Sequence, residues 1–193
     1  MTAPNLNDTE WGLEFVDFFR SLGFFKEYEQ LSNSHLAAVL VDMLRLEMKE
    51  NLDPSDPLAD LLLLKYDDGR VWWDDTEADV CAENQVYRET LEEWGRISLG
   101  AFLPTEIQEN WQGAEGPIEI SFKLNGSPLT LHPRYMDDYL DLAILSGINT
   151  AILGTGIQFA VHEIFDQTAF ILALTMDQKR RLQEQRRWRF AKV

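Results

Sequence analysis

The sequence predicts an α+β protein with a mostly antiparallel sheet, built from hairpins and packed with several helices. Three observations lead to this class. Apolar residues recur at helical spacing in some segments, they alternate with polar residues in others, and Asp-Gly and Asn-Gly pairs separate the extended segments. The resulting order is helix, helix, hairpin, helix, three strands, helix, hairpin and helix, which favours antiparallel α+β architecture.

Two helices are expected first. Asn7 and Glu10 have the spacing of a capping box. One apolar stripe then follows at helical spacing: Trp11, Phe15, Phe18 and Leu22. A second helix is expected over residues 35–50, and the two prolines within 51–57 end it. Residues 1–60 could therefore form a helical N-terminal subdomain within a single α+β domain spanning residues 1–193.

The middle of the chain predicts strands around one helix. Residues 61–66 and 70–73 flank Asp67-Asp68-Gly69 and are expected to form a β-hairpin, with Leu61-Leu62-Leu63-Leu64 as a buried strand. A helix follows over 83–97. Strands are then expected at 106–111, at 118–124 and from 127 through Leu131, the last two joined by Asn125-Gly126, which is the best hairpin signal in the chain.

The last third predicts a helix, a hairpin and a second helix. Asp137 is expected to cap a helix that runs to Leu153. Strands at 157–164 and 169–174 should turn at Asp166-Gln167. Thr175 is expected to cap a basic C-terminal helix over residues 175–193.

Charge is unevenly distributed along the chain. The net charge is −16, but residues 179–193 hold seven basic residues against Glu184 and carry +6, which leaves −22 for the rest. A body that acidic repels nucleic acid and attracts basic surfaces, although acidity can also serve solubility alone. Cys81 is the only cysteine, so an intramolecular disulfide is excluded and a reducing cytoplasm is expected. No signal peptide or membrane span is expected.

The basic C-terminal segment admits three interpretations. Its arginines, interleaved with Trp188 and Phe190, could bind nucleic acid by contacting phosphates and stacking on bases. The charge of −22 on the rest of the chain argues against that. We expect instead that the segment docks on acidic patches of its own domain or of a second copy, as a homodimer would require, with the two aromatic residues as apolar anchors. Contact with a different partner is the third alternative.

The most informative stretch begins in the second strand of the predicted hairpin. Trp72 and Trp73 are adjacent on a strand, so they should face opposite sides, one buried and one exposed. Four acids follow in the next loop: Asp74, Asp75, Glu77 and Asp79. A calcium loop counted from Asp75 would need glycine at position six and glutamate at position twelve, where Val80 and Val86 stand. The six residues are predicted to form a partner-binding surface, the alternatives being acids that stabilise a helix N-terminus and weak binding of a divalent ion.

A second acidic cluster, Asp137-Asp138-Tyr139-Leu140-Asp141, supports one enzymatic alternative. On a helix Asp137 and Asp141 would share a face, as two metal-binding carboxylates do. With His132 or His162 they could form a divalent-metal hydrolase site. No spacing fixes either histidine nearby, so a capping role for Asp137 is favoured. No metal or other cofactor is expected.

The sequence thus favours a binding protein over an enzyme. No polar set has the spacing of a catalytic site. An acidic scaffold with aromatic residues beside clustered carboxylates suits the sequestering of a basic protein, such as a toxin or a secreted effector. By analogy of class alone, small cytoplasmic bacterial immunity proteins and effector adaptors share this character.

Overall fold

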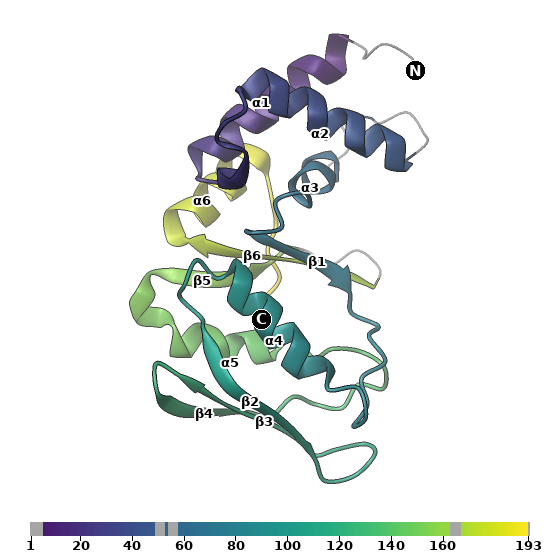
Figure 1. The fold of residues 1–193 in the computed structure, drawn as a ribbon, viewed down its shortest axis with the longest axis vertical. Helices are drawn as coiled ribbons and strands as arrows, with labels where there is room; N and C mark the ends of the chain where they lie inside the picture. Colours follow the sequence, from purple (N-terminus) through teal and green to yellow (C-terminus); the bar gives the residue numbers. More distant parts are fainter. Residues whose placement is uncertain (1–5, 49–52, 54–57, 163–166, 193) are drawn as a thin grey trace. The chain divides into compact units, whose positions relative to one another are not determined.

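The chain divides into two units, residues 1–71 (unit 1) and residues 72–193 (unit 2), which are described separately (Figure 1). The computed structural model describes residues 6–48, 53, 58–162 and 167–192. It contains α-helices together with two three-stranded antiparallel sheets, so the predicted α+β class is confirmed. Within the described residues, no helix is long and apolar enough to cross a membrane.

Unit 1 is helical. Its elements are α1 (Leu6–Ser21), the short 3-10 helix η1 (Lys26–Tyr28), α2 (Asn33–Met48) and α3 (Ala59–Leu64). Helices α1 and α2 approach closely at Gly12, where an added Cβ would lie 2.9 Å from Val41 Cγ2. Helix α1 already includes Leu6, and the predicted cap, which depends on the side chain of Asn7, lies outside the described residues. Apart from residue 53, the predicted break at 51–57 lies outside the described residues.

The predicted strand at 61–66 is wrong. Residues 59–64 form α3, with helical hydrogen bonds such as Leu62 N to Leu58 O at 3.0 Å. A short run of consecutive leucines is compatible with a buried strand or a buried helical turn, because hydrophobic periodicity cannot separate the two. Glu47 of α2 fixes the end of α3, since it pairs with Lys65 and accepts a 2.8 Å hydrogen bond from Tyr66.

Unit 2 contains the strands of both sheets, except that β1 begins at the last residue of unit 1. One sheet has the order β1 (Val71–Asp75), β6 (Thr168–Thr175), β5 (Ile157–Val161), and the other has the order β2 (Pro104–Trp111), β3 (Ile118–Leu124), β4 (Ser127–Leu131). The predicted Asn125-Gly126 hairpin is confirmed: both residues have positive φ, as a tight turn of this kind requires.

Helices α4 (Val86–Ile97) and α5 (Ile144–Ala151) lie between the two sheets of unit 2 (Figure 1). Their apolar faces join alternate residues of β3 and the inward faces of β5 and β6 in one core. Its members include Tyr87, Leu91, Trp94, Ile120, Phe122, Leu145, Ile148, Phe159 and Ile171. This core holds β1 and the loops that follow it in place.

The predicted helix over 137–153 begins later than expected. Helix α5 starts at Ile144, and Asp137 lies in a turn with φ of 52°. The Asp141 carboxylate accepts a 3.1 Å hydrogen bond from Ala143 N just before the helix. Backbone groups of 138–140 are instead paired with residues 76–80, so they are not available for a helix. Asp137 and Asp141 therefore do not share a helix face.

Helix α6 (Met176–Arg186) confirms the predicted cap at Thr175. Thr175 Oγ1 accepts a 3.2 Å hydrogen bond from Gln178 N, and Gln178 Oε1 accepts one of 2.7 Å from Thr175 N, which completes a capping box. The helix ends at Arg186, earlier than the predicted boundary at 193, because the next residue adopts a left-handed conformation with φ of 57°.

The residues after α6 return to the sheet formed by β1, β6 and β5, beside the end of β5. The ring of Trp188 is buried and lies 5.2 Å from that of His162. Phe190 forms an antiparallel bridge with His162, and Ala191 N donates a 2.9 Å hydrogen bond to Val161 O. Trp188 and Phe190 therefore pack against the chain's own domain, one of the two placements expected for these apolar anchors.

Candidate functional site: an acidic face on unit 2

Strand β1 directs its two indole rings to opposite sides. Trp72 is 5% exposed, packs edge-on against Trp94 at 5.9 Å, and donates a 2.6 Å hydrogen bond from Nε1 to Glu93 Oε2. Trp73 is 37% exposed and lies 6.3 Å from the ring of Phe170. The prediction of one buried and one exposed indole is confirmed, and the exposed ring begins the acidic segment.

The acids after Trp73 are exposed and orient the local backbone. Asp74 Oδ1 accepts a 2.8 Å hydrogen bond from Asp75 N, and Asp75 Oδ1 accepts a 2.9 Å hydrogen bond from Glu77 N. Asp79 is exposed in a left-handed conformation with φ of 49°. Such side-chain to backbone bonds are typical of turns. The loop is thus shaped by its own carboxylates.

A second segment, far away in the sequence, runs antiparallel beside this loop. Ala78 N donates a 2.8 Å hydrogen bond to Asp138 O, and Leu140 N donates one of the same length to Thr76 O. Glu77 and Tyr139 form a β-bridge. The two acidic clusters that the sequence presents separately therefore lie together. We call the combined surface the acidic face, made of Trp73, Asp74, Asp75, Glu77, Asp79, Asp137, Asp138 and Tyr139.

Gln167 ties the two segments together at their centre. Its backbone carbonyl accepts hydrogen bonds from Thr76 N at 2.7 Å and from Thr76 Oγ1 at 2.6 Å. Its side-chain Nε2 donates to Tyr139 Oη at 2.7 Å and to a carboxylate oxygen of Glu77. Gln167, expected only as a turn residue, could not be predicted as part of the site, because no local pattern indicates a partner about 90 residues away at Glu77.

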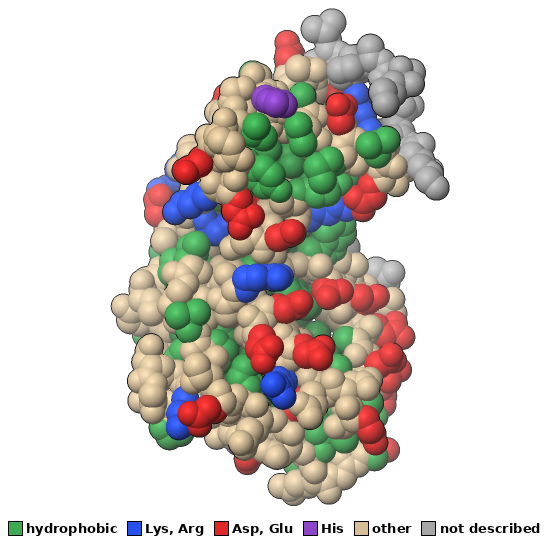
Figure 2. Space-filling view, in the orientation of Figure 1, with side chains coloured by type: hydrophobic (Ala, Val, Ile, Leu, Met, Phe, Trp, Pro, Cys, Tyr) green, Lys and Arg blue, Asp and Glu red, His purple; other side chains and the backbone are tan. Residues whose placement is uncertain are grey.

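The electrostatics of this region are dominated by negative charge. Residues 74–80 and 136–140 contain six acids and no lysine or arginine. The pKa of the adjacent Tyr135 is raised, first by burial and then by the charges of Asp137, Glu115 and Asp138. Figure 2 shows acidic side chains along the margin of unit 2 where Figure 1 draws the chain leaving β1. The arrangement suits contact with several cationic side chains at once.

The residues of the metal alternative are placed apart from one another. Asp141 is buried and binds Arg134, accepting hydrogen bonds of 2.9 Å from N, 3.2 Å from Nε and 3.3 Å from Nη2. His132 is exposed, and His162 is buried against Trp188. Among the residues that the structure describes, no group of three or more His, Cys, Asp or Glu side chains could hold a metal ion.

The pKa of Asp141 reflects this pairing. Burial by itself would raise the pKa of the carboxyl, but the hydrogen bonds from Arg134 and Ala143 and the Arg134 charge outweigh it. The pKa of Asp141 is consequently below its ordinary value, as expected for a carboxylate held by a guanidinium. Asp141 therefore fixes the loop before α5, and its oxygens are engaged within the fold.

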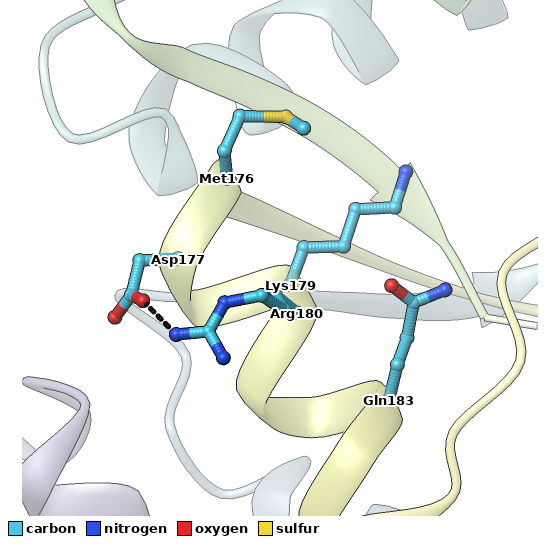
Figure 3. A pocket seen from close by; sticks show the side chains of 5 residues that line it. All are labelled: Met176, Asp177, Lys179, Arg180 and Gln183. Carbon is cyan, nitrogen blue, oxygen red and sulfur yellow. Dashed lines mark hydrogen bonds and ion pairs between the residues drawn. The ribbon is translucent and has the colours of Figure 1, made fainter.

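A surface hollow of about 490 Å³ lies along the first turns of α6 (Figure 3). It is lined by Met176, Asp177, Lys179, Arg180 and Gln183. Arg180 already pairs with Asp177 at 2.5 Å and with Glu184 at 2.7 Å. Burial lowers the pKa of Lys179, whose Nζ lies 5.3 Å from the Phe190 ring centroid. Arg180 and Lys179 of the hollow therefore already contact neighbouring residues, and the acidic face remains the stronger candidate site.

No protein family model, curated protein or solved structure matches this chain. No activity or partner can therefore be inferred from a relative. The functional assignment depends on the acidic face and its chemistry.

Proposed function

We propose that this protein binds and neutralises a basic protein through the acidic face of unit 2. The observation that carries the proposal is the pairing of residues 76–80 with 138–140, which fixes two acidic clusters from distant parts of the chain in one surface. A fixed array of carboxylates loses little conformational freedom on binding, so more of the interaction energy is available for affinity.

Charge and aromatic rings have separate roles in this proposal. The negative potential raises the rate at which a basic partner finds the face, since electrostatic complementarity acts mainly on association. Trp73 and Tyr139 supply the amphipathic rings that dominate affinity at protein interfaces. Tyr139 lies beside the carboxylate of Glu77, its hydroxyl 3.2 Å from Glu77 Oε2, and Trp73 directly precedes Asp74 and Asp75 on β1.

The partner class that fits best is a toxin or a secreted effector with a basic surface, and the setting is the cytoplasm. Proteins that act on nucleic acids bind phosphates with lysine and arginine clusters. Carboxylates spread over one face can occupy such a cluster in place of phosphates, which blocks substrate access. The protein would then serve as an immunity protein or as an adaptor that keeps an effector inactive.

Affinity capture from cells that naturally encode the protein tests this function. The tagged full chain should recover one basic protein. Recovery should fall at least fivefold with Asp74→Asn, Asp137→Asn and Asp138→Asn combined, which changes three exposed acids of the face to isosteric amides. The matched control combines Glu10→Gln, Glu29→Gln and Glu119→Gln, three exposed acids outside the face. Its charge change is the same, and recovery should match wild type.

Neutralisation is then measured with the purified partner. The wild-type protein and the control variant should suppress the partner's toxicity or enzymatic activity, and the triple amide variant should not. Equal recovery by all three proteins, or recovery of no basic protein at all, would contradict the proposal.

A further inference from the structure

Helix α2 of unit 1 carries an exposed apolar stripe in addition to its buried one. Leu36, Leu40 and Leu44 are buried in the helical core. Val39, Met43 and Leu46 follow at spacings of four and three, so they line a second stripe of the same helix. Met43 is 41% exposed, Leu46 is 78% exposed and Val39 is half-buried. Figure 2 shows apolar side chains exposed on unit 1 where Figure 1 draws α2.

The geometry of the stripe fits the side of another helix. Residues at i, i+4 and i+7 cover two turns, or about 10 Å along the axis at about 1.5 Å per residue. An amphipathic helix presents its apolar residues with the same spacing, so the two stripes can interdigitate. Met43 adds adaptability, because its unbranched side chain fills irregular gaps at binding surfaces.

The negative charge of unit 1 favours a basic partner at this stripe. Residues 1–71 contain 14 acids and 6 basic residues, a net charge of −8, so two copies of unit 1 repel each other and a basic partner is attracted. Asp42, which is exposed, lies three residues after Val39 and four before Leu46, so it flanks the stripe on α2. We propose that the stripe docks an amphipathic α-helix of a partner protein whose flanking residues are lysine or arginine. This surface is in unit 1, and the proposal is independent of the acidic face on unit 2.

The probe is a fluorescently labelled synthetic helix in which leucine occupies the a and d positions and lysine the others. A second peptide with glutamate in place of lysine tests the charge requirement. Both are titrated against the full chain and followed by fluorescence anisotropy. Hydrogen exchange of the α2 amides, measured with and without the lysine peptide, reports where it binds.

Leu46→Gln removes the most exposed residue of the stripe without touching the core. Leu153→Gln is its matched control, since Leu153 in unit 2 is also 78% exposed. We expect the lysine peptide to bind wild type and the Leu153→Gln variant equally, to bind Leu46→Gln at least fivefold more weakly, and to slow exchange in α2. The glutamate peptide should bind at least tenfold more weakly than the lysine peptide.

Three results would overturn the proposal. The first is equal binding by the Leu46→Gln and Leu153→Gln variants. The second is peptide binding lost only when Asp74, Asp137 and Asp138 are changed, which would place it on the acidic face. The third is a dimer in sedimentation experiments that Leu46→Gln dissociates, because a second copy of the chain would then be the occupant.

Discussion

The hydroxyl of Tyr139 donates a 3.2 Å hydrogen bond to Glu77 Oε2, joining two residues that are 62 positions apart in the chain. Gln167 Nε2 donates to both groups. This small network connects the loop after β1, the turn before α5 and the start of β6. The acidic face is therefore a tertiary feature, held by specific polar contacts rather than by the sequence of one loop.

Tyr139→Phe should loosen this connection without unfolding unit 2. The substitution removes the hydroxyl that bonds Glu77 and Gln167, so the free energy of unfolding should fall by about 1 kcal/mol, the ordinary net value of such a bond. Urea denaturation measures the change. A matched variant, Tyr135→Phe, should have a smaller effect, and an equal loss in both would argue against the network.

The two adjacent tryptophans should respond very differently to substitution. Trp72→Phe removes the 2.6 Å hydrogen bond to Glu93 and leaves a gap beside Trp94, so a loss of about 2 kcal/mol is expected. Trp73→Phe keeps an aromatic ring near Phe170 at an exposed position and should cost about 0.5 kcal/mol. Urea denaturation compares the two variants. The opposite order would show that the assignment of inner and outer ring is wrong.

Asp67 in unit 1 should make stability depend on pH. Burial raises its pKa from 3.8 to about 6, partly offset by the 2.5 Å hydrogen bond from Phe25 N and by the charge of Arg70. The folded state therefore holds the proton more tightly than the unfolded state. The contribution of Asp67 to the free energy of unfolding, about 3 kcal/mol, is fully present below the unfolded pKa of 3.8 and is lost as pH rises to about 6.

Hydrogen exchange of α1 and α2 amides, corrected for intrinsic rates, checks this dependence on Asp67. The Asp67→Asn variant should lose most of the decline between pH 3.8 and about 6. Asp68→Asn, at the exposed neighbouring position, should keep it. Identical pH profiles for wild type and Asp67→Asn would refute the assignment.

Asp141 should have the opposite dependence on pH. Its folded pKa lies below the ordinary 3.8, so its stabilising contribution is present above that value and is lost as pH falls through the folded pKa. Asp141→Asn should cost about 2 kcal/mol at neutral pH, since several charge-assisted bonds disappear. Arg134→Gln should cost less, because the backbone N–H groups of Arg134 and Ala143 still reach Asp141. Urea denaturation at neutral and acidic pH measures both variants.

The elements predicted best are those with an unambiguous local signal. Asn125 and Gly126 readily adopt the positive φ of a tight turn. Thr175 and Gln178 bond each other's backbone N–H groups at the start of α6, so both signals are contained in a few adjacent residues. The predictions for the leucines of 61–64 and for the segment after Asp137 were wrong because the structure of each segment depends on partners elsewhere in the chain. In the first case Glu47 of α2 binds the residues that end α3, and in the second residues 76–80 take the backbone groups of 138–140.

In the candidate site, too, the features with a local signal could be predicted and those that depend on long-range pairing could not. The opposite orientation of Trp72 and Trp73 follows from the two-residue repeat of a strand, so the sequence is sufficient to predict it. The joining of Asp137 and Asp138 to the loop of Asp74 and Asp75 is long-range β pairing, which no local window contains. Gln167 has no signal of its own, because a lone glutamine is ordinary on any surface.

The association rate constant with the captured basic partner is the most direct test of the central claim. It should be measured for wild type, for the Asp74→Asn, Asp137→Asn, Asp138→Asn variant and for the matched Glu10→Gln, Glu29→Gln, Glu119→Gln control, from about 50 to about 500 mM salt. Wild type and control should associate about tenfold more slowly at high salt, and the triple amide variant should already be slow at low salt. An association rate constant that is indifferent to salt and equal in all three proteins would contradict the account.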